Sequence, residues 1–224
     1  MIKKYGFILP SIFNLPVESL DLKLKPVLAA GAECVHYDVM DGTLTSKFFD
    51  GFKYLELTKN LLQKYDVESD IHLVASYQQK FFNLVIKFQP SKVSIHYESK
   101  EDVFGNLKFL KLRGIKAGLA INLNSYPDVD ELAYLNPDYF HLIANSEQTG
   151  IKDFQNSVLI KAANIKKVFP DRLVTLDCGV KEHHIIPAQK NGVDHVVIGS
   201  AIFENPDPGL IFKKMSELIL KKNS

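Results

Sequence analysis

The chain has 224 residues and a formal net charge of +1, with 46% apolar and 24% charged residues. This is the balance of an ordinary folded globular protein. A net charge this small gives no long-range attraction to nucleic acid or to an acidic membrane surface. We therefore expect neither nucleic acid nor a membrane as a partner.

The first residues, MIKKYGFILPSIF, hold two lysines and then a short apolar run that Pro10 interrupts. This run is shorter than the core of a signal peptide and no small-residue cleavage site follows, so it is typical of a first strand. No stretch approaches the ~20 apolar residues that cross a bilayer. Cys34 and Cys178 form no CxxC pair, which indicates reduced thiols and a cytoplasmic protein.

Strand-like apolar runs alternate with helical patterns along the whole chain. We expect strands at Gly6–Leu9, Cys34–Val39, Ile71–Val74, Val93–His96, Ala117–Ile121, Tyr139–Ile143, Val174–Leu176 and His195–Ile198. We expect helices at Val17–Ala30, Phe52–Tyr65, Gln78–Phe88, Asp102–Arg113, Asp128–Tyr134, Val158–Phe169, Glu182–Asn191 and Pro208–Lys221.

Strands that alternate with helices predict an α/β fold with a parallel sheet. Eight such units predict a closed (β/α)8 TIM barrel, with residues 1–224 forming one domain. A doubly wound open sheet is the alternative. In a (β/α)8 barrel the active site lies at the carboxyl ends of the strands, so polar residues at those ends are the first candidates for function.

Acidic and histidine side chains stand at three of these strand ends. In VHYDVMDG, residues 35–42, alternation points His36 and Asp38 to the same face of a buried strand. A histidine and a carboxylate buried together must be paired, hydrogen-bonded or bound to a metal. DIHLV and TLDCG add His72 and Asp177, so we predict one metal site built from His36, Asp38, His72 and Asp177. Imidazole and carboxylate ligands without thiolate suit one divalent ion, which can be zinc, iron(II), manganese or cobalt.

Six motifs together resemble the strand-end motifs of the ribulose-phosphate 3-epimerases, in that family's order. They are PSIFN (10–14), VHYDVMDG (35–42), DIHLV (70–74), VSIHYES (93–99), TLDCGV (175–180) and VIGSAIF (197–203). The resemblance implies a TIM barrel of the ribulose-phosphate binding type that interconverts D-ribulose 5-phosphate and D-xylulose 5-phosphate. It also implies a divalent metal cofactor, a sugar-phosphate substrate and a homo-oligomer, either a dimer or a hexamer.

The same resemblance assigns roles to individual residues. It makes His36, Asp38, His72 and Asp177 the metal ligands. Asp38 and Asp177 would be the catalytic acid and base, one on each face of a metal-stabilised enediolate. The residues implied to bind the substrate and its phosphate are Ser11, Met40, His72, Gly179, Gly199 and Ser200.

Several positions depart from the family pattern, mostly in the parts that hold phosphate and cover the substrate. The loop IANSEQTG, residues 143–150, has one glycine and carries Glu147, where the family has a glycine-rich loop. The other departures are Cys178 for a glycine, Val74 and Ile143 for methionines, and Thr43 for a histidine. These changes leave two alternatives open: an epimerase of another ketose phosphate such as a hexulose 6-phosphate, and a non-catalytic metabolite-binding barrel. A decarboxylase is disfavoured because no strand end carries an Asp-x-Lys-x-x-Asp run.

The remaining histidines have either an open role or no predicted role in the reaction. His96, with Glu98, matches a family strand end, where it would either contact the substrate or support the site as a structural pair. No role matches His141, His183, His184 or His195, which we expect to be structural or surface residues.

Overall fold

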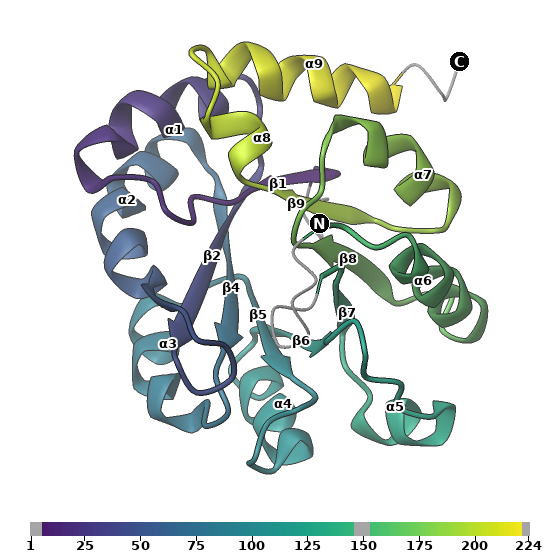
Figure 1. Cartoon of the computed structure of the whole chain (residues 1–224). Coiled ribbons are helices and arrows are strands. Elements are labelled where there is room, and N and C mark those ends of the chain that lie inside the picture. The colour runs from purple at the N-terminus through teal and green to yellow at the C-terminus, as the bar shows by residue number, and fades with distance from the viewer. Residues whose placement is uncertain (1–5, 146–152, 221–224) are drawn as a thin grey trace.

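The computed structural model describes residues 6–145 and 153–220 as a ring of strands surrounded by helices (Figure 1). The strands are β1 (Ile8–Pro10), β2 (Cys34–Asp41), β3 (Phe48–Asp50), β4 (Glu68–Val74), β5 (Lys92–His96), β6 (Lys116–Ile121), β7 (Tyr139–Ile143), β8 (Leu173–Asp177) and β9 (His195–Ile198). All eight predicted strands are present: seven lie within these ranges, and the first, predicted at Gly6–Leu9, is two residues shorter at its start and ends at Pro10.

In the described part of the chain the strands form one sheet in the order β1-β9-β8-β7-β6-β5-β4-β2-β3. Every neighbouring pair is parallel except β2 and β3. A parallel bridge between Ser11 and His36 joins the end of β1 to β2 and brings the two ends of the curved sheet together. The strand order follows the chain around the ring without a reversal, so the (β/α)8 barrel is confirmed and the open doubly wound sheet is excluded.

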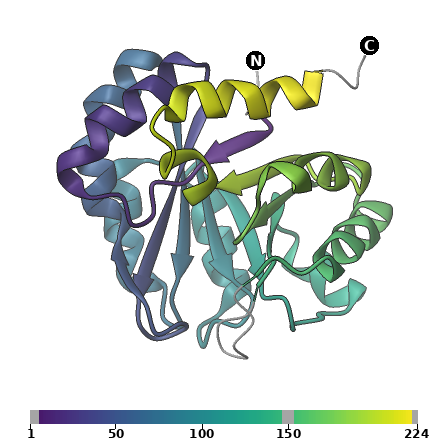
Figure 2. The same ribbon diagram turned by 45° about the horizontal axis from the view of Figure 1, so that its top comes forward.

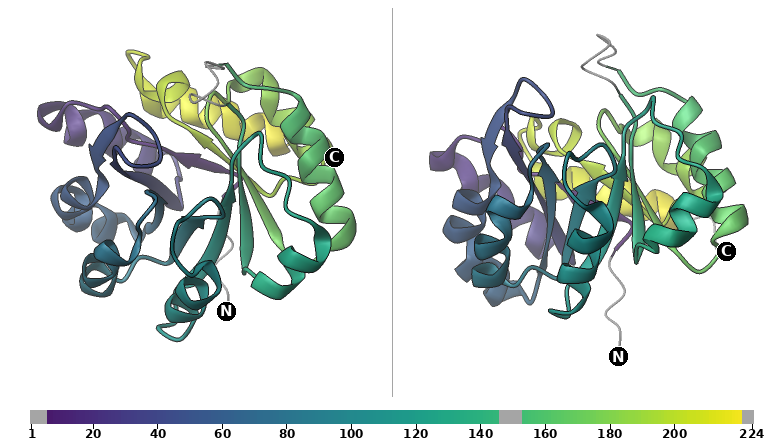
Figure 3. Two further views of the ribbon diagram at one scale, coloured as in Figure 1. Left: turned by 60° about the horizontal axis from the view of Figure 1, so that its bottom comes forward. Right: turned by 90° about the horizontal axis from the view of Figure 1, so that it is seen from below.

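The α-helices in the described ranges are α1 (Leu20–Ala29), α2 (Gly51–Tyr65), α3 (Phe82–Phe88), α4 (Val103–Lys111), α5 (Val129–Leu135), α6 (Ser157–Val168), α7 (Ile185–Lys190), α8 (Ser200–Phe203) and α9 (Pro208–Leu220). Short 3₁₀ turns precede α1, α3 and α7, at Val17–Ser19, Gln79–Phe81 and Glu182–His184. The helices lie on the outside of the strand ring from both directions in Figure 3. In Figure 2 the yellow α9 runs alongside the purple α1, so the last helix completes the outer layer beside the first.

Two elements were not predicted. No strand or helix was expected between Val39 and Phe52, but Phe48–Asp50 forms β3 and pairs antiparallel with Val39–Asp41. Because β2 is long, a returning segment can pair with its end, and three residues are too few to show an alternating pattern. The four-residue α8 is likewise too short for a helical period to appear in the sequence.

Close packing at the carboxyl end of β2 depends on one glycine. A Cβ atom at Gly51 would lie 2.1 Å from the Asp38 carbonyl oxygen. The first turn of α2 can therefore pack this close to β2 only because residue 51 has no side chain. The Asp50 side chain caps this helix by accepting a hydrogen bond from the Lys53 N–H. The helix and the strand that carries Asp38 are thereby held in fixed relation.

No helix within residues 6–145 and 153–220 is long and apolar enough to cross a bilayer. The prediction that residues 1–224 make one domain stays a prediction.

Candidate active site

The four residues predicted to bind metal come from β2, β4 and β8 and converge inside the barrel. Asp38 and His72 are direct neighbours in the parallel register of β2 and β4. His72 Nδ1 lies 3.1 Å from Asp38 Oδ1 and 3.6 Å from Asp177 Oδ2. His36 Nε2 lies 3.5 Å from Asp38 Oδ1 and 3.8 Å from Asp177 Oδ2. All four side chains are buried, and His36 is completely so.

Asp70 fixes the orientation of the His36 ring. Asp70 is fully buried on β4, and its Oδ2 lies 3.0 Å from His36 Nδ1. Although burial alone would raise the pKa of Asp70, the nearby charge of Lys92 and the contact with His36 hold it well below its usual range. An ionised carboxylate only accepts hydrogen bonds, so Nδ1 carries the proton and Nε2 is the nitrogen that faces the site.

A second chain of contacts orients His72. His72 Nε2 lies 2.9 Å from His96 Nε2, and His96 Nδ1 lies 3.0 Å from Glu98 Oε2. Because the Glu98 carboxylate accepts from His96, the other His96 nitrogen accepts from His72. His72 Nδ1 is then the unprotonated nitrogen that faces Asp38 and Asp177. His96 and Glu98 are therefore a pair that supports the site, and His96 also lines the neighbouring cavity.

The pKa values of His36, Asp38 and Asp177 are shifted in the directions expected where buried carboxylates attract positive charge. Burial alone would lower the pKa of His36, but Asp38 and Asp70 hold it well above its ordinary value. Burial alone would raise the pKa values of Asp38 and Asp177, but the surrounding histidines hold both below the usual range for aspartate. The two carboxylates therefore favour positive charge at this place, either as an extra proton on His36 and His72 or as a bound cation.

The donor atoms in the site fit a divalent metal. Without that extra proton, and with the hydrogen bonds described above, His36 Nε2 and His72 Nδ1 present lone pairs to two carboxylates. Within the described residues, His36 Nε2 has no hydrogen-bond partner. Nitrogen and oxygen acceptors facing each other in a buried place repel unless a cation lies among them. Imidazole with carboxylate is a ligand set used for zinc, iron, manganese and cobalt.

Sequence reasoning assigned no role to His141, yet the barrel brings it into the site. Its Nε2 lies 3.2 Å from Asp177 Oδ2, and its ring centroid is 4.3 Å from that of His72. One ligand atom each from His36, His72, His141 and Asp177 lies within 4.8 Å of the others. Burial lowers the pKa of His141 to about 4, so the ring is neutral at pH 7. Alternation in YFHLI, which points His141 away from its apolar neighbours and into the barrel, was the signal that could have found it.

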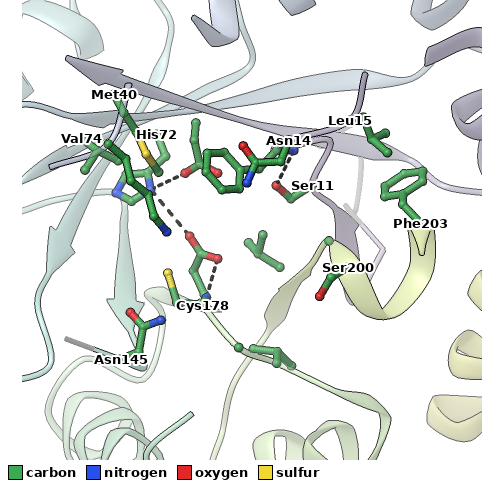
Figure 4. A pocket seen from close by; sticks show the side chains of 18 of the residues that line it. Ser11, Asn14, Leu15, Met40, His72, Val74, Asn145, Cys178, Ser200 and Phe203 are labelled. Carbon is green, nitrogen blue, oxygen red and sulfur yellow. Dashed lines mark hydrogen bonds and ion pairs between the residues drawn. The ribbon is translucent and has the colours of Figure 1, made fainter. Parts of the chain in front are cut away.

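A cavity of about 750 Å³ opens next to the metal-binding residues, within the size range of small-molecule sites. In Figure 4, Met40 and His72 lie toward one end of this cavity and Ser200 and Phe203 toward the other, with Ser11 between them. The predicted site residues that line it are Ser11, Asp38, Met40, His72, Asp177, Gly179, Gly199 and Ser200. His36 lies behind them, fully buried.

Three of the departures from the family pattern lie in the cavity wall. Val74, Ile143 and Cys178 line the cavity. Cys178 has a φ of 73°, in the left-handed region where glycine is favoured, so the chain adopts here the turn that a glycine would form without strain. The stretch of IANSEQTG that carries Glu147 lies outside the described residues.

Residues 7–203 match the sequence model of the ribulose-phosphate 3 epimerase family. The chain belongs to this family. The ribulose-phosphate 3-epimerase of Serratia marcescens is 30% identical over 216 residues, which cover 92% of this chain and 98% of that protein. The ribulose-phosphate 3-epimerase of Aquifex aeolicus is 28% identical over 204 residues, which cover 88% of this chain and 90% of that protein.

The fold also occurs in solved structures with little sequence similarity. The 3-hexulose-6-phosphate synthase of Salmonella typhimurium aligns with a TM-score of 0.73 and 16% identity, over 96% of this chain and 98% of that one. At this identity the likeness supports the barrel alone, because one fold serves many activities.

Proposed function

We propose that this member of the ribulose-phosphate 3 epimerase family is a metal-dependent ketose-phosphate 3-epimerase, an isomerase that interconverts D-ribulose 5-phosphate and D-xylulose 5-phosphate. Its relatives of the same name align over most of the chain. The single observation that carries the proposal is the pair Asp38 and Asp177, which come from different strands, flank His72 and line one cavity.

Epimerisation at a carbon beside a ketone requires a proton to leave one face and another to arrive on the opposite face. Asp38 lies on β2 and Asp177 on β8, so the two carboxylates can address a planar intermediate from two sides. One carboxylate takes the proton and the other returns one. A divalent ion held by His36, Asp38, His72 and Asp177 would supply positive charge that stabilises the developing oxyanion.

The other lining residues divide the cavity between the two ends of a sugar phosphate. Ser11 offers a hydroxyl for a substrate hydroxyl, and Met40 covers the reacting end with an apolar side chain that excludes water. Backbone N–H groups near Gly179 and at Gly199 and Ser200 would hold the phosphate. These residues follow β8 and β9, the seventh and eighth parallel strands of the barrel, where such barrels usually bind phosphate.

The test is to incubate the metal-loaded protein with D-ribulose 5-phosphate and to follow the formation of D-xylulose 5-phosphate. We expect turnover that is lost on chelation and restored by zinc, manganese, cobalt or iron(II). Turnover of a hexulose 6-phosphate, measured in parallel, decides whether the departures from the family pattern in the cavity wall changed the preferred sugar. A protein that binds metal but turns over neither sugar would be the non-catalytic barrel, and a protein without metal under replete conditions would contradict the proposed cofactor.

Assembly as a dimer or hexamer and a location in the cytoplasm are predictions from the resemblance and the composition. Measuring the mass in solution by light scattering tests the first of these.

A further inference from the structure

His141 meets both the candidate metal centre and a polar network deeper in the barrel. Its Nε2 lies 3.2 Å from Asp177 Oδ2, and its Nδ1 lies 2.9 Å from Ser94 Oγ. His141 and Ser94 are completely buried, so neither can exchange these contacts for water. Which ring nitrogen of His141 carries the proton therefore depends on whether the Ser94 hydroxyl donates to Nδ1 or accepts from it.

A neighbouring buried network ends on an ionised carboxylate. Tyr139, on the same strand as His141, donates its hydroxyl proton to Asp70 Oδ1 at 3.2 Å. Lys92 Nζ lies 3.5 Å from the other Asp70 oxygen and supplies the compensating charge. The Ser94 hydroxyl can both donate and accept, so it can accept a hydrogen bond from His141 Nδ1–H.

Gly118 on β6 allows this network to form. A Cβ atom at this position would lie 2.2 Å from Cζ of the Tyr139 ring, a separation that real contacts do not show. Any side chain at Gly118 would therefore displace the ring and separate the Tyr139 hydroxyl from Asp70. The geometry around His141 thus depends on four neighbouring strands, β4 to β7.

With the proton on Nδ1, the Nε2 of a neutral His141 presents a lone pair to Asp177, just as His36 and His72 present theirs. The ligand atoms of His36, His72, His141 and Asp177 already lie within 4.8 Å of one another. We propose that His141 is an additional metal ligand, so that three imidazoles bind the ion together with carboxylate. This inference rests on the proposed metal-dependent function and adds a residue to its site.

The competing arrangement places the proton on Nε2, where His141 would donate to Asp177 and act only as a positioning residue. Ser94 would then donate its hydroxyl proton to His141 Nδ1. The two arrangements differ in the number of imidazoles on the metal, which is three in the first and two in the second. They also differ in metal preference, because a further imidazole favours zinc and cobalt over manganese.

X-ray absorption at the zinc edge of the zinc-loaded full chain counts the imidazoles bound to the ion. We expect three in the unaltered protein and two in His141→Gln, together with zinc affinity at least about tenfold weaker by chelator competition. Manganese affinity should fall by less than zinc affinity.

His195→Gln is the matched control, because His195 is also a buried histidine but its Nδ1 contacts the Gly6 carbonyl, away from the site. It should keep three imidazoles and the original zinc affinity. Two imidazoles in the unaltered protein would overturn the role of His141 and leave the proposed function standing. Failure of the unaltered protein to bind any divalent ion would overturn both the role of His141 and the proposed metal-dependent function. The imidazole count in the unaltered protein does not depend on whether any variant folds.

Discussion

The two faces of the barrel strands have opposite chemistry. On β7, Phe140 and Leu142 point outward into the apolar layer between strands and helices. Tyr139 and His141, on the same strand, point inward, where Tyr139 donates to Asp70 and His141 Nε2 lies 3.2 Å from Asp177 Oδ2. Both faces are almost completely buried, so solvent exposure does not distinguish them.

The difference separates stability from chemistry. The outward layer is stabilised by burial of apolar area, which is non-directional and tolerates changes of shape. Charged groups inside cost free energy unless they are paired, and here they are paired in chains that end at Asp70 and Glu98. We therefore expect outward changes to alter the free energy of unfolding, and inward changes to alter metal binding, turnover and pH dependence.

The largest effect is expected for Asp177→Asn. An amide cannot carry the proton, so the rate of epimerisation should fall by about 10²–10⁴-fold. Exchange of the substrate C3 proton with solvent should persist in one direction if Asp38 still acts as base. Metal content is measured alongside, because Asp177 is also a predicted ligand, and near-normal turnover would exclude it as acid or base.

His72→Ala tests the metal centre directly. Removal of a predicted ligand should weaken binding of a divalent ion by more than the roughly 10–100-fold typical of an outer residue. Chelator competition measures this, and His36→Ala should behave alike because both rings face Asp38 and Asp177. Full metal occupancy in both variants would refute the assigned ligand set.

Leu119→Ala probes the outward face, because Leu119 is fully buried in the apolar layer. The cavity should lower the free energy of unfolding by about 2–5 kcal/mol. Turnover per folded molecule should stay near that of the unaltered protein. Urea denaturation and activity below the transition measure the two quantities, and a selective loss of turnover would show that the two faces are not independent.

His195→Gln should change the dependence of stability on pH. Burial, together with the nearby charge of Lys92, lowers the pKa of His195 to about 4 from an ordinary 6.5. Between these values the unfolded chain binds more protons than the folded one, so this residue reduces stability as pH falls from about 6.5 to 4. The unaltered protein should therefore lose about 2 kcal/mol more than His195→Gln between pH 7 and pH 5. Parallel loss in both proteins, measured by urea denaturation, would exclude His195 as the source.

The sequence by itself determined the alternation of elements, and with it the barrel. It also made His36, Asp38, His72 and Asp177 candidates for one site, because these polar residues stand in apolar strands that converge in a parallel barrel. The prediction of the fold succeeds because strand alternation and helical period are local properties of the chain. β3 and α8 are too short to leave such a pattern, so neither was predicted.

Only the tertiary structure decided how the buried polar groups pair. That Asp70 orients His36, that His96 and Glu98 orient His72, and that His141 reaches Asp177 all depend on contacts between strands far apart in the chain. The register of neighbouring strands decides which side chains meet at one level of the barrel, and no local pattern contains it. The space that Gly118 leaves for the Tyr139 ring also depends on the tertiary structure, because the two residues meet only when β6 and β7 lie side by side.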